Sequence, residues 1–170
     1  MKQIGIISDT HSFLDDKVFK HFDACDEIWH AGDIGEIEVA NRLKAFKTFR
    51  AVYGNIDDNA VRLEYPKELF FECEGQKVYM IHIAGPPGKY LKEVKAMVLE
   101  LKPTLFICGH SHQLSIFSDK IHHNMLFLNP GAAGKHGFHQ MRTLVRLKIE
   151  EGRIFDVQVI ELGKRAELIK

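Results

Sequence analysis

Short apolar runs that each end in a polar residue beside glycine or aspartate constrain the fold of this chain more than any other feature. In the first third these runs cover residues 4–7, 27–30 and 49–53, and they end at Ser8-Asp9, Gly32-Asp33 and Gly54-Asn55. Runs of this length, bounded by turn residues, are typical of buried strands. Apolar residues at helical spacing lie between the runs, over residues 17–22 and from about Glu36. The first third therefore predicts a βαβαβ order.

The rest of the chain predicts mostly strands with one helix among them. Strands are expected over residues 69–73, 78–82, 105–108, 115–118, 125–128, 143–149 and 153–161, with hairpin turns at Glu74-Gly75 and Glu151-Gly152. An apolar face at helical spacing predicts a helix over residues 90–101, which Pro103 follows. Short polar connections favour neighbouring elements, so we expect the α/β class: a layered α-β-β-α sandwich of two mixed sheets flanked by helices.

Length and charge limit the possible classes of protein. The 170 residues predict a single domain, residues 1–170. Lys and Arg together number 23, as do Asp and Glu, which argues against general attraction to nucleic acid or membranes. Three cysteines, Cys25, Cys73 and Cys108, form no C-x-x-C pair and predict reduced, buried thiols. No apolar stretch approaches the roughly 20 residues of a membrane span, so we expect a cytoplasmic protein.

The polar residues at the predicted strand ends fall into five short blocks. In chain order the blocks are Asp9-Thr10-His11, Gly32-Asp33, Gly54-Asn55-Ile56-Asp57, His82 and Gly109-His110-Ser111-His112. In a fold built from parallel strands, such positions meet at one edge of the sheet. Imidazole, carboxylate and amide groups without thiolate suit manganese, iron, zinc or related divalent ions, and argue against a structural zinc site. The candidate metal ligands are Asp9, His11, Asp33, Asn55, His82, His110 and His112.

These blocks resemble, in order and nearly end to end, those of the calcineurin-like metallophosphoesterase superfamily, most closely its small YfcE-type phosphodiesterases. The run Leu128-Asn129-Pro130-Gly131 also resembles a family segment near the site. The resemblance implies two divalent metal ions, manganese first, with iron, nickel, zinc or magnesium as alternatives. One ion would be held by Asp9, His11, Asp33 and His112, and the other by Asp33, Asn55, His82 and His110. Asp33 would bridge the ions, and Asp33, Asn55 and His82 would take part in catalysis.

The implied function is metal-dependent hydrolysis of a small phosphodiester. Two ions held close together lower the pKa of a bridging water, and the resulting hydroxide can attack phosphorus. The fuller family motif has a histidine where this chain has Ile56, and that histidine assists the transition state or the leaving group. Small YfcE-type members often lack it too. Loss of a general acid costs about 100- to 10,000-fold in rate, so activated aryl phosphodiesters should suffer least.

Two other functions compete with this interpretation. The eukaryotic retromer scaffold subunit resembles the same fold, which suggests a catalytically weak metal-binding scaffold or protein-interaction module. That pattern has lost ligand residues, whereas this chain keeps all seven, which favours an enzyme. A monoesterase or nucleotidase is a third alternative, which the missing acid at Ile56 argues against. Edge strands and the helix at Tyr90 are candidate surfaces for a homo-oligomer.

Several other polar residues stand outside the five blocks. His21, His122 and His123 belong to no motif, and we expect them at the surface. His136, His139, Lys135 and Arg142 follow the Asn-Pro-Gly segment, where phosphate contact and a solvated polar loop are both open. Ser111 lies between two candidate ligands and is not expected to act as a nucleophile, because no histidine is left to activate it.

Overall fold

The computed structural model describes residues 1–168 as two five-stranded sheets packed face to face with helices outside. The strands are β1 (Lys2–Ile7), β2 (Glu27–His30), β3 (Thr48–Ala51), β4 (Glu68–Cys73), β5 (Gln76–Ile81), β6 (Leu105–Ile107), β7 (Leu114–Asp119), β8 (Met125–Pro130), β9 (Met141–Glu150) and β10 (Arg153–Lys164). The helices are α1 (Lys17–Phe22), α2 (Ile37–Phe46), α3 (Asn59–Glu64), α4 (Lys92–Leu101) and the 3-10 helix η1 (Arg165–Leu168). One sheet has the order β10-β9-β1-β2-β3 and the other β4-β5-β6-β8-β7.

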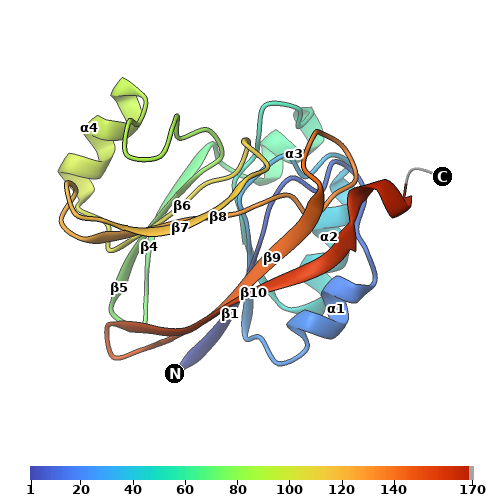
Figure 1. Ribbon diagram of the computed structural model, residues 1–170, viewed down its shortest axis with the longest axis horizontal. Helices are drawn as coiled ribbons and strands as arrows, with labels where there is room; N and C mark the ends of the chain where they lie inside the picture. The colour runs from blue at the N-terminus through green and yellow to red at the C-terminus, as the bar shows by residue number, and fades with distance from the viewer. Residues whose placement is uncertain (169–170) are drawn as a thin grey trace.

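Three apolar layers hold these elements together. Alternate residues of β1 point to opposite faces, so Ile4 and Ile6 pack between the sheets while Ile7 packs toward α1 and α2. Val94 and Val98 of α4 pack on the outer face of the second sheet. Figure 1 shows the resulting layers, with α4 on one side and α1, α2 and α3 on the other. The α/β fold of two mixed sheets flanked by helices is confirmed.

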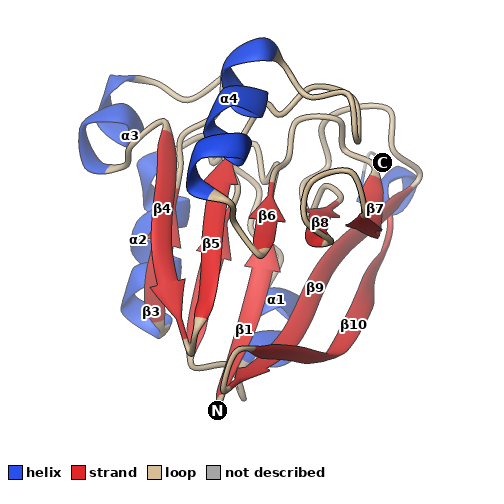
Figure 2. Cartoon of the chain, turned by 90° about the vertical axis from the view of Figure 1, so that its left-hand side faces the viewer, coloured by secondary structure: helices blue, strands red, loops and turns tan. Residues whose placement is uncertain are grey.

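Parallel pairing brings the candidate site residues to one edge. In the first sheet β1, β2 and β3 run parallel, and in the second β5, β6 and β8 do. Figure 2 shows β1, β5 and β6 pointing toward the same end of the molecule. The loops that leave these carboxyl ends carry the blocks of Asp9, Asp33, Asn55, His82 and His110. The topology therefore delivers residues spread over a hundred positions to one place.

The elements differ from the predicted ones mainly where they are short. Helix α3 was not predicted, because it has six residues and buries only Val61, so no periodic apolar face marks it. Its N-terminus is instead capped by Asp58, whose side chain accepts from the amides of Ala60 and Val61. Helix α4 begins at Lys92 rather than at Tyr90. The predicted strand over 49–53 is β3, which ends at Ala51.

The surface expectation for His122 was wrong, and neither alternative left open for Arg142 describes its position. His122 is buried, and its Nδ1 lies 2.8 Å from Asp119 Oδ2, which also accepts from the Tyr90 hydroxyl at 2.6 Å. Arg142 is buried as well, donating to Asp15 Oδ2 at 2.9 Å and to the Leu162 carbonyl at 3.0 Å. Arg142 reaches Asp15 across 127 positions, and Asp119, the partner of His122, is tied to Tyr90 across 29 positions, so local sequence did not reveal either burial.

Two further observations concern the cysteines and the helices. Cys25, Cys73 and Cys108 are free and buried. Over residues 1–168, the helices are all too short or too polar to cross a bilayer.

Candidate metal centre

Left-handed backbone marks the loops that carry the candidate ligands. Asp9, His11, Asp33, His110 and His112 all have positive φ, between 45° and 69°. This conformation costs roughly 1–2 kcal/mol for a residue with a side chain, and its concentration at one place is typical of functional sites. The loops hold one another in place, because the amides of Asp9 and His11 each donate at 3.0 Å to the carbonyls of Gly32 and Asp33.

The first cluster joins β1, β2 and the loop after β6. It consists of Asp9, His11, Asp33 and His112, whose potential ligand atoms all lie within 4.8 Å of one another. His112 Nε2 lies 3.1 Å from Asp9 Oδ1, and His11 Nε2 lies 3.5 Å from Asp33 Oδ2. The two imidazole Nε2 atoms are themselves 3.4 Å apart. The ligand atoms of two carboxylates and two imidazoles thus surround a space the size of one metal ion.

The second cluster lies on the other side of Asp33. Asp33, His82 and His110 place one ligand atom each within 4.8 Å. His82 Nε2 is 3.2 Å from Asp33 Oδ1, whereas His11 of the first cluster faces Oδ2. The two oxygens of one carboxylate therefore face two different groups of ligands.

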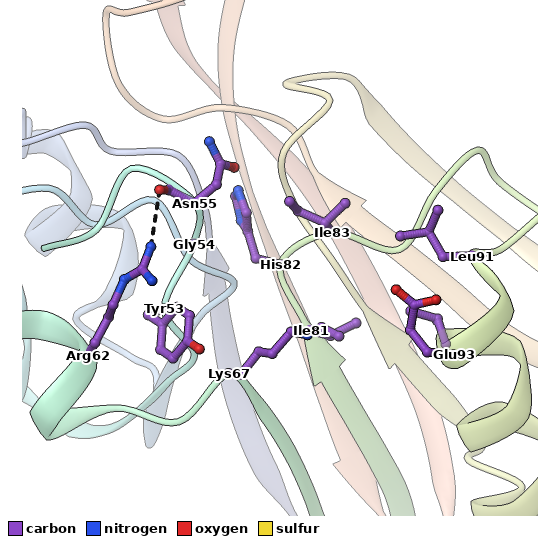
Figure 3. Close-up of a pocket in the computed structure, with 11 residues that line it drawn as sticks. Tyr53, Gly54, Asn55, Arg62, Lys67, Ile81, His82, Ile83, Leu91 and Glu93 are labelled. Carbon is purple, nitrogen blue, oxygen red and sulfur yellow. Dashed lines mark hydrogen bonds between the residues drawn. The ribbon is translucent and has the colours of Figure 1, made fainter. Parts of the chain in front are cut away.

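Asn55 lies beside the second cluster. Together with Asp33 and His110 it lines a cleft of about 410 Å³. Figure 3 shows its side chain next to the His82 imidazole. Its backbone carbonyl accepts from the Arg62 guanidinium at 3.2 Å, which holds the loop after β3. All seven residues selected from the sequence are thus brought to one region of the molecule.

One buried polar atom in each cluster, Asp9 Oδ1 and His82 Nε2, has no hydrogen-bond partner among the described residues. The ring nitrogen Nδ1 of His82 lies 2.7 Å from the Ala31 carbonyl oxygen, which can only accept, so this nitrogen carries the proton. In the neutral ring the other nitrogen, Nε2, then presents a lone pair toward Asp33. Lone pairs and negative charge that face one another in this way fit a divalent cation between them.

The electrostatics of the clusters reflect the crowded carboxylates. Burial lowers the pKa of His82, but Asp33 and Asp9 outweigh this effect and raise it above its usual value. Burial raises the pKa of Asp33, but the His82 side chain and the Ile56 amide lower it by more, so it lies below its usual range. Asp33 is therefore a carboxylate at neutral pH, as a metal ligand must be.

Surrounding groups orient Asp9. The Ser8 hydroxyl donates to Asp9 Oδ2 at 2.6 Å, and the His110 amide donates to the same oxygen at 3.2 Å. Oδ1 is thereby left to face the cluster. Such outer contacts are what fix the orientation of ligands in metal sites.

Asp57 ties together the loops after β2 and β3 of the first sheet, and Asn129 holds the loop after β6 of the second. Asp57 accepts from the amides of Gly35 and Gly54, each at 2.7 Å. The Asn129 amide donates to the Gly109 carbonyl at 2.8 Å and to Ser111 Oγ at 3.1 Å. Asp57 belongs to the third block and Asn129 to the Asn-Pro-Gly segment, so the motifs contained a signal for both. Their positioning roles were not predicted.

His30 is a buried neighbour of the site that the sequence analysis did not select. Its Nδ1 accepts from the Gly32 amide at 3.1 Å, so Nε2 carries the proton and donates to Thr10 Oγ1 at 3.0 Å. Burial lowers its pKa to about 4, which keeps the ring neutral near pH 7. This chain of bonds joins the loops after β1 and β2 without reaching the clusters.

His136 and His139, for which the sequence left phosphate contact and a solvated loop open, lie beside the first cluster. The His136 ring centroid is 4.9 Å from that of His11, and the His139 centroid is 5.3 Å from that of His112. Both line the 410 Å³ cleft. His21 is half-buried and His123 exposed, and neither belongs to the two clusters.

Two packed sheets with Asp/His clusters at one edge are the arrangement expected of a metallophosphoesterase. The chain matches the calcineurin-like phosphoesterase superfamily domain over residues 1–152, and it belongs to this family. It is 31% identical over 165 residues to a probable metallophosphoesterase of Methanothermobacter thermautotrophicus, covering 94% of this chain and 92% of the relative.

Solved structures of low sequence identity share the fold. A protein described as a novel archaeal phosphodiesterase superimposes with a TM-score of 0.76 at 21% identity, covering 94% of this chain and 99% of that one. Vps29 from Entamoeba histolytica, solved in complex with zinc, superimposes with a TM-score of 0.72 at 15% identity, covering 96% and 99%. At these identities the likeness establishes the two-sheet fold.

Proposed function

We propose that this protein is a phosphodiesterase that binds two divalent metal ions and hydrolyses a small phosphodiester. One observation carries the proposal: the two oxygens of Asp33 face two separate groups of metal-ligating side chains. A carboxylate in this position suits a bridge between two ions. The structural neighbour described as an archaeal phosphodiesterase supports the phosphodiester as substrate class.

Each candidate ligand has a role in this proposal. Asp9, His11, Asp33 and His112 would hold one ion, and Asp33, Asn55, His82 and His110 the other. Manganese is the first choice for both ions, with iron, nickel, zinc and magnesium as alternatives. Bound in this way, the ions would lower the pKa of a water between them and neutralise charge on the phosphate oxygens.

The protein itself contributes position and access. The Ala31 carbonyl holds His82 in the tautomer that leaves Nε2 free for an ion, and Ser8 turns Asp9 toward the cluster. The 410 Å³ cleft leaves room above the ligands for a phosphate and its substituents. His136 is exposed at its wall, where its ring can contact a phosphate oxygen.

Metal loading combined with turnover tests the proposal. After manganese loading and desalting, mass spectrometry should find about two ions per chain, and bis(p-nitrophenyl) phosphate should be hydrolysed. A chelator should remove both the metal and the activity, and added manganese should restore them. A folded protein that binds no metal would overturn the site. A protein that binds two ions but hydrolyses no phosphodiester would favour the scaffold alternative.

Ile56 limits the leaving groups that the site can serve. Its side chain is 45% exposed and lines the cleft, and its amide donates to Asp33 Oδ1 at 3.1 Å. An alkyl side chain here offers no proton to a departing alkoxide. We expect Ile56→His to raise kcat for an alkyl ester with a poor leaving group at least about 10-fold, because a positioned general acid contributes 100-fold or more.

The matched control for this change is Ile56→Phe, which introduces a ring without an ionisable proton. Rates for p-nitrophenyl esters should change little in either variant, because p-nitrophenolate needs no proton to depart. If Ile56→His accelerates neither class of ester, the missing acid is not what limits the reaction.

A further inference from the structure

A side lobe of the cleft adjoins the second cluster. This hollow of about 320 Å³ shares Asn55 with the cleft above the ligands and also borders His82. In Figure 3, Tyr53 and Arg62 line one side of the lobe, Leu91 and Glu93 the other, and Ile81 and Ile83 lie between them. The side lobe therefore opens beside the second cluster and next to the cleft above the ligands.

The lining of the side lobe combines an apolar surface with two charged side chains that can contact a bound group, Lys67 and Glu93. Ile81, Ile83, Leu91 and Val94 supply the apolar part. The Arg62 guanidinium is already engaged, since it donates to the Asp57 carbonyl at 2.6 Å and lies 4.8 Å from the Tyr53 ring centroid. Lys67 and Glu93, by contrast, are exposed on the rim. One can donate to a bound group and the other can accept from it.

A neighbouring hollow shows what is specific to the side lobe. The space bounded by Pro86 and Pro87 on the far side of His110 measures about 530 Å³, and its lining contains no Lys, Arg, Asp or Glu. This hollow could enclose a group but has no acidic side chain, lysine or arginine to pair with it. Both hollows combine a mostly apolar wall with a few polar groups, as binding sites typically do, but of the two the side lobe alone has charged side chains in its lining.

We propose that the side lobe binds one ester group of the phosphodiester, a planar heteroaromatic group of the nucleoside type. Such a group has apolar faces for Leu91 and Ile83, and donors and acceptors at its edge for Glu93 and Lys67. The other ester group departs through the cleft on the Ile56 side. This inference rests on the proposed phosphodiesterase function and names the substrate class that the site selects.

Two diesters with the same leaving group test the subsite. They are methyl p-nitrophenyl phosphate, which cannot reach into the side lobe, and the p-nitrophenyl ester of thymidine monophosphate, which can. With manganese added, the wild-type protein should hydrolyse both, with the larger kcat/KM for the thymidine ester. Leu91→Trp should fill the lobe and lower kcat/KM for the thymidine ester about 10-fold or more, the effect expected of an obstructed apolar pocket.

The controls separate the subsite from the metal site. Methyl p-nitrophenyl phosphate should be hydrolysed by Leu91→Trp within about twofold of the wild-type rate, since an apolar contact made only with the larger ester is removed. Leu99→Trp places the same side chain at an exposed position of α4 outside the lobe, and should leave both esters unaffected. Lys67→Met should weaken only the thymidine ester, mainly through KM.

Each outcome bears on one of the two proposals. Equal losses for both esters in Leu91→Trp, or no loss for either, would overturn the side lobe as an ester subsite while leaving the phosphodiesterase intact. A wild-type protein that shows no preference for the thymidine ester would do the same. If the metal-loaded wild-type protein hydrolyses neither diester, the proposed function fails, and the subsite assignment fails with it.

Discussion

Replacing Asp33 with asparagine is expected to lower phosphodiesterase turnover by more than about 100-fold and to reduce the bound metal from two ions per chain toward one. Changes to groups that merely support a ligand already cost about 10- to 100-fold in metal affinity or activity, so the loss of a bridging ligand should cost more. Asparagine suits the test because it tolerates the left-handed backbone of residue 33, where φ is 54°.

The geometry also predicts which ion is lost. The Ile56 amide donates to Oδ1 of Asp33 at 3.1 Å, so an asparagine at this position keeps its carbonyl oxygen there. The new amide nitrogen then takes the place of Oδ2, which faces His11. An amide nitrogen cannot bind a cation, and the ion between Asp9, His11 and His112 should therefore be the weaker one.

Metal content by mass spectrometry and turnover of bis(p-nitrophenyl) phosphate measure the two effects. Asp16→Asn is the matched control, because the Asp16 side chain is 91% exposed and, among residues 1–168, pairs only with Arg42, at 3.0 Å. This control should retain both ions and full turnover. An Asp33→Asn protein with two ions and undiminished turnover would contradict the bridging role.

The positions of the candidate ligands could be predicted because the fold follows simple rules. Parallel strands end at one edge of a sheet, so polar residues such as Asp9, Asp33 and His82 that follow strands were expected to meet. The structure does group Asp9, His11, Asp33 and His112, and separately Asp33, His82 and His110. Which carboxylate oxygen faces which cluster depends on side-chain torsions, and the order of the motifs contains no information about these.

The supporting contacts were harder to predict because their partners are distant in the chain. Arg142 bonds to Asp15 across 127 positions, and the Asn129 side chain reaches back 20 positions to the Gly109 carbonyl. Local composition at Arg142 indicates only a charged residue in a polar segment. The left-handed backbone at Asp9 and His11 likewise accompanies bonds to distant groups, the Gly32 and Asp33 carbonyls.

Gly54 lies directly against the Asp33 carboxylate, in a space that no side chain could share. A Cβ atom at residue 54 would overlap both the Asp33 carboxylate and the Asp33 backbone nitrogen. The φ of Gly54 is not positive, so alanine would fit the backbone conformation and only space opposes it. We expect Gly54→Ala to displace the Asp33 carboxylate, and to lower metal content and turnover as severely as Asp33→Asn, more than about 100-fold.

The second expected effect of Gly54→Ala is a loss of about 1–3 kcal/mol in the free energy of unfolding, because an added methyl group in a filled space forces its neighbours to move. Gly5→Ala is the control that separates the two effects. Its φ is also not positive, and its Cβ would crowd the Phe22 ring at 2.7 Å, away from every candidate ligand. Both variants should therefore melt at a lower temperature, but only Gly54→Ala should lose metal and turnover. If Gly5→Ala loses metal to the same extent, general destabilisation explains the result. If Gly54→Ala keeps both ions and full turnover, the carboxylate of Asp33 does not need the space that glycine leaves for it.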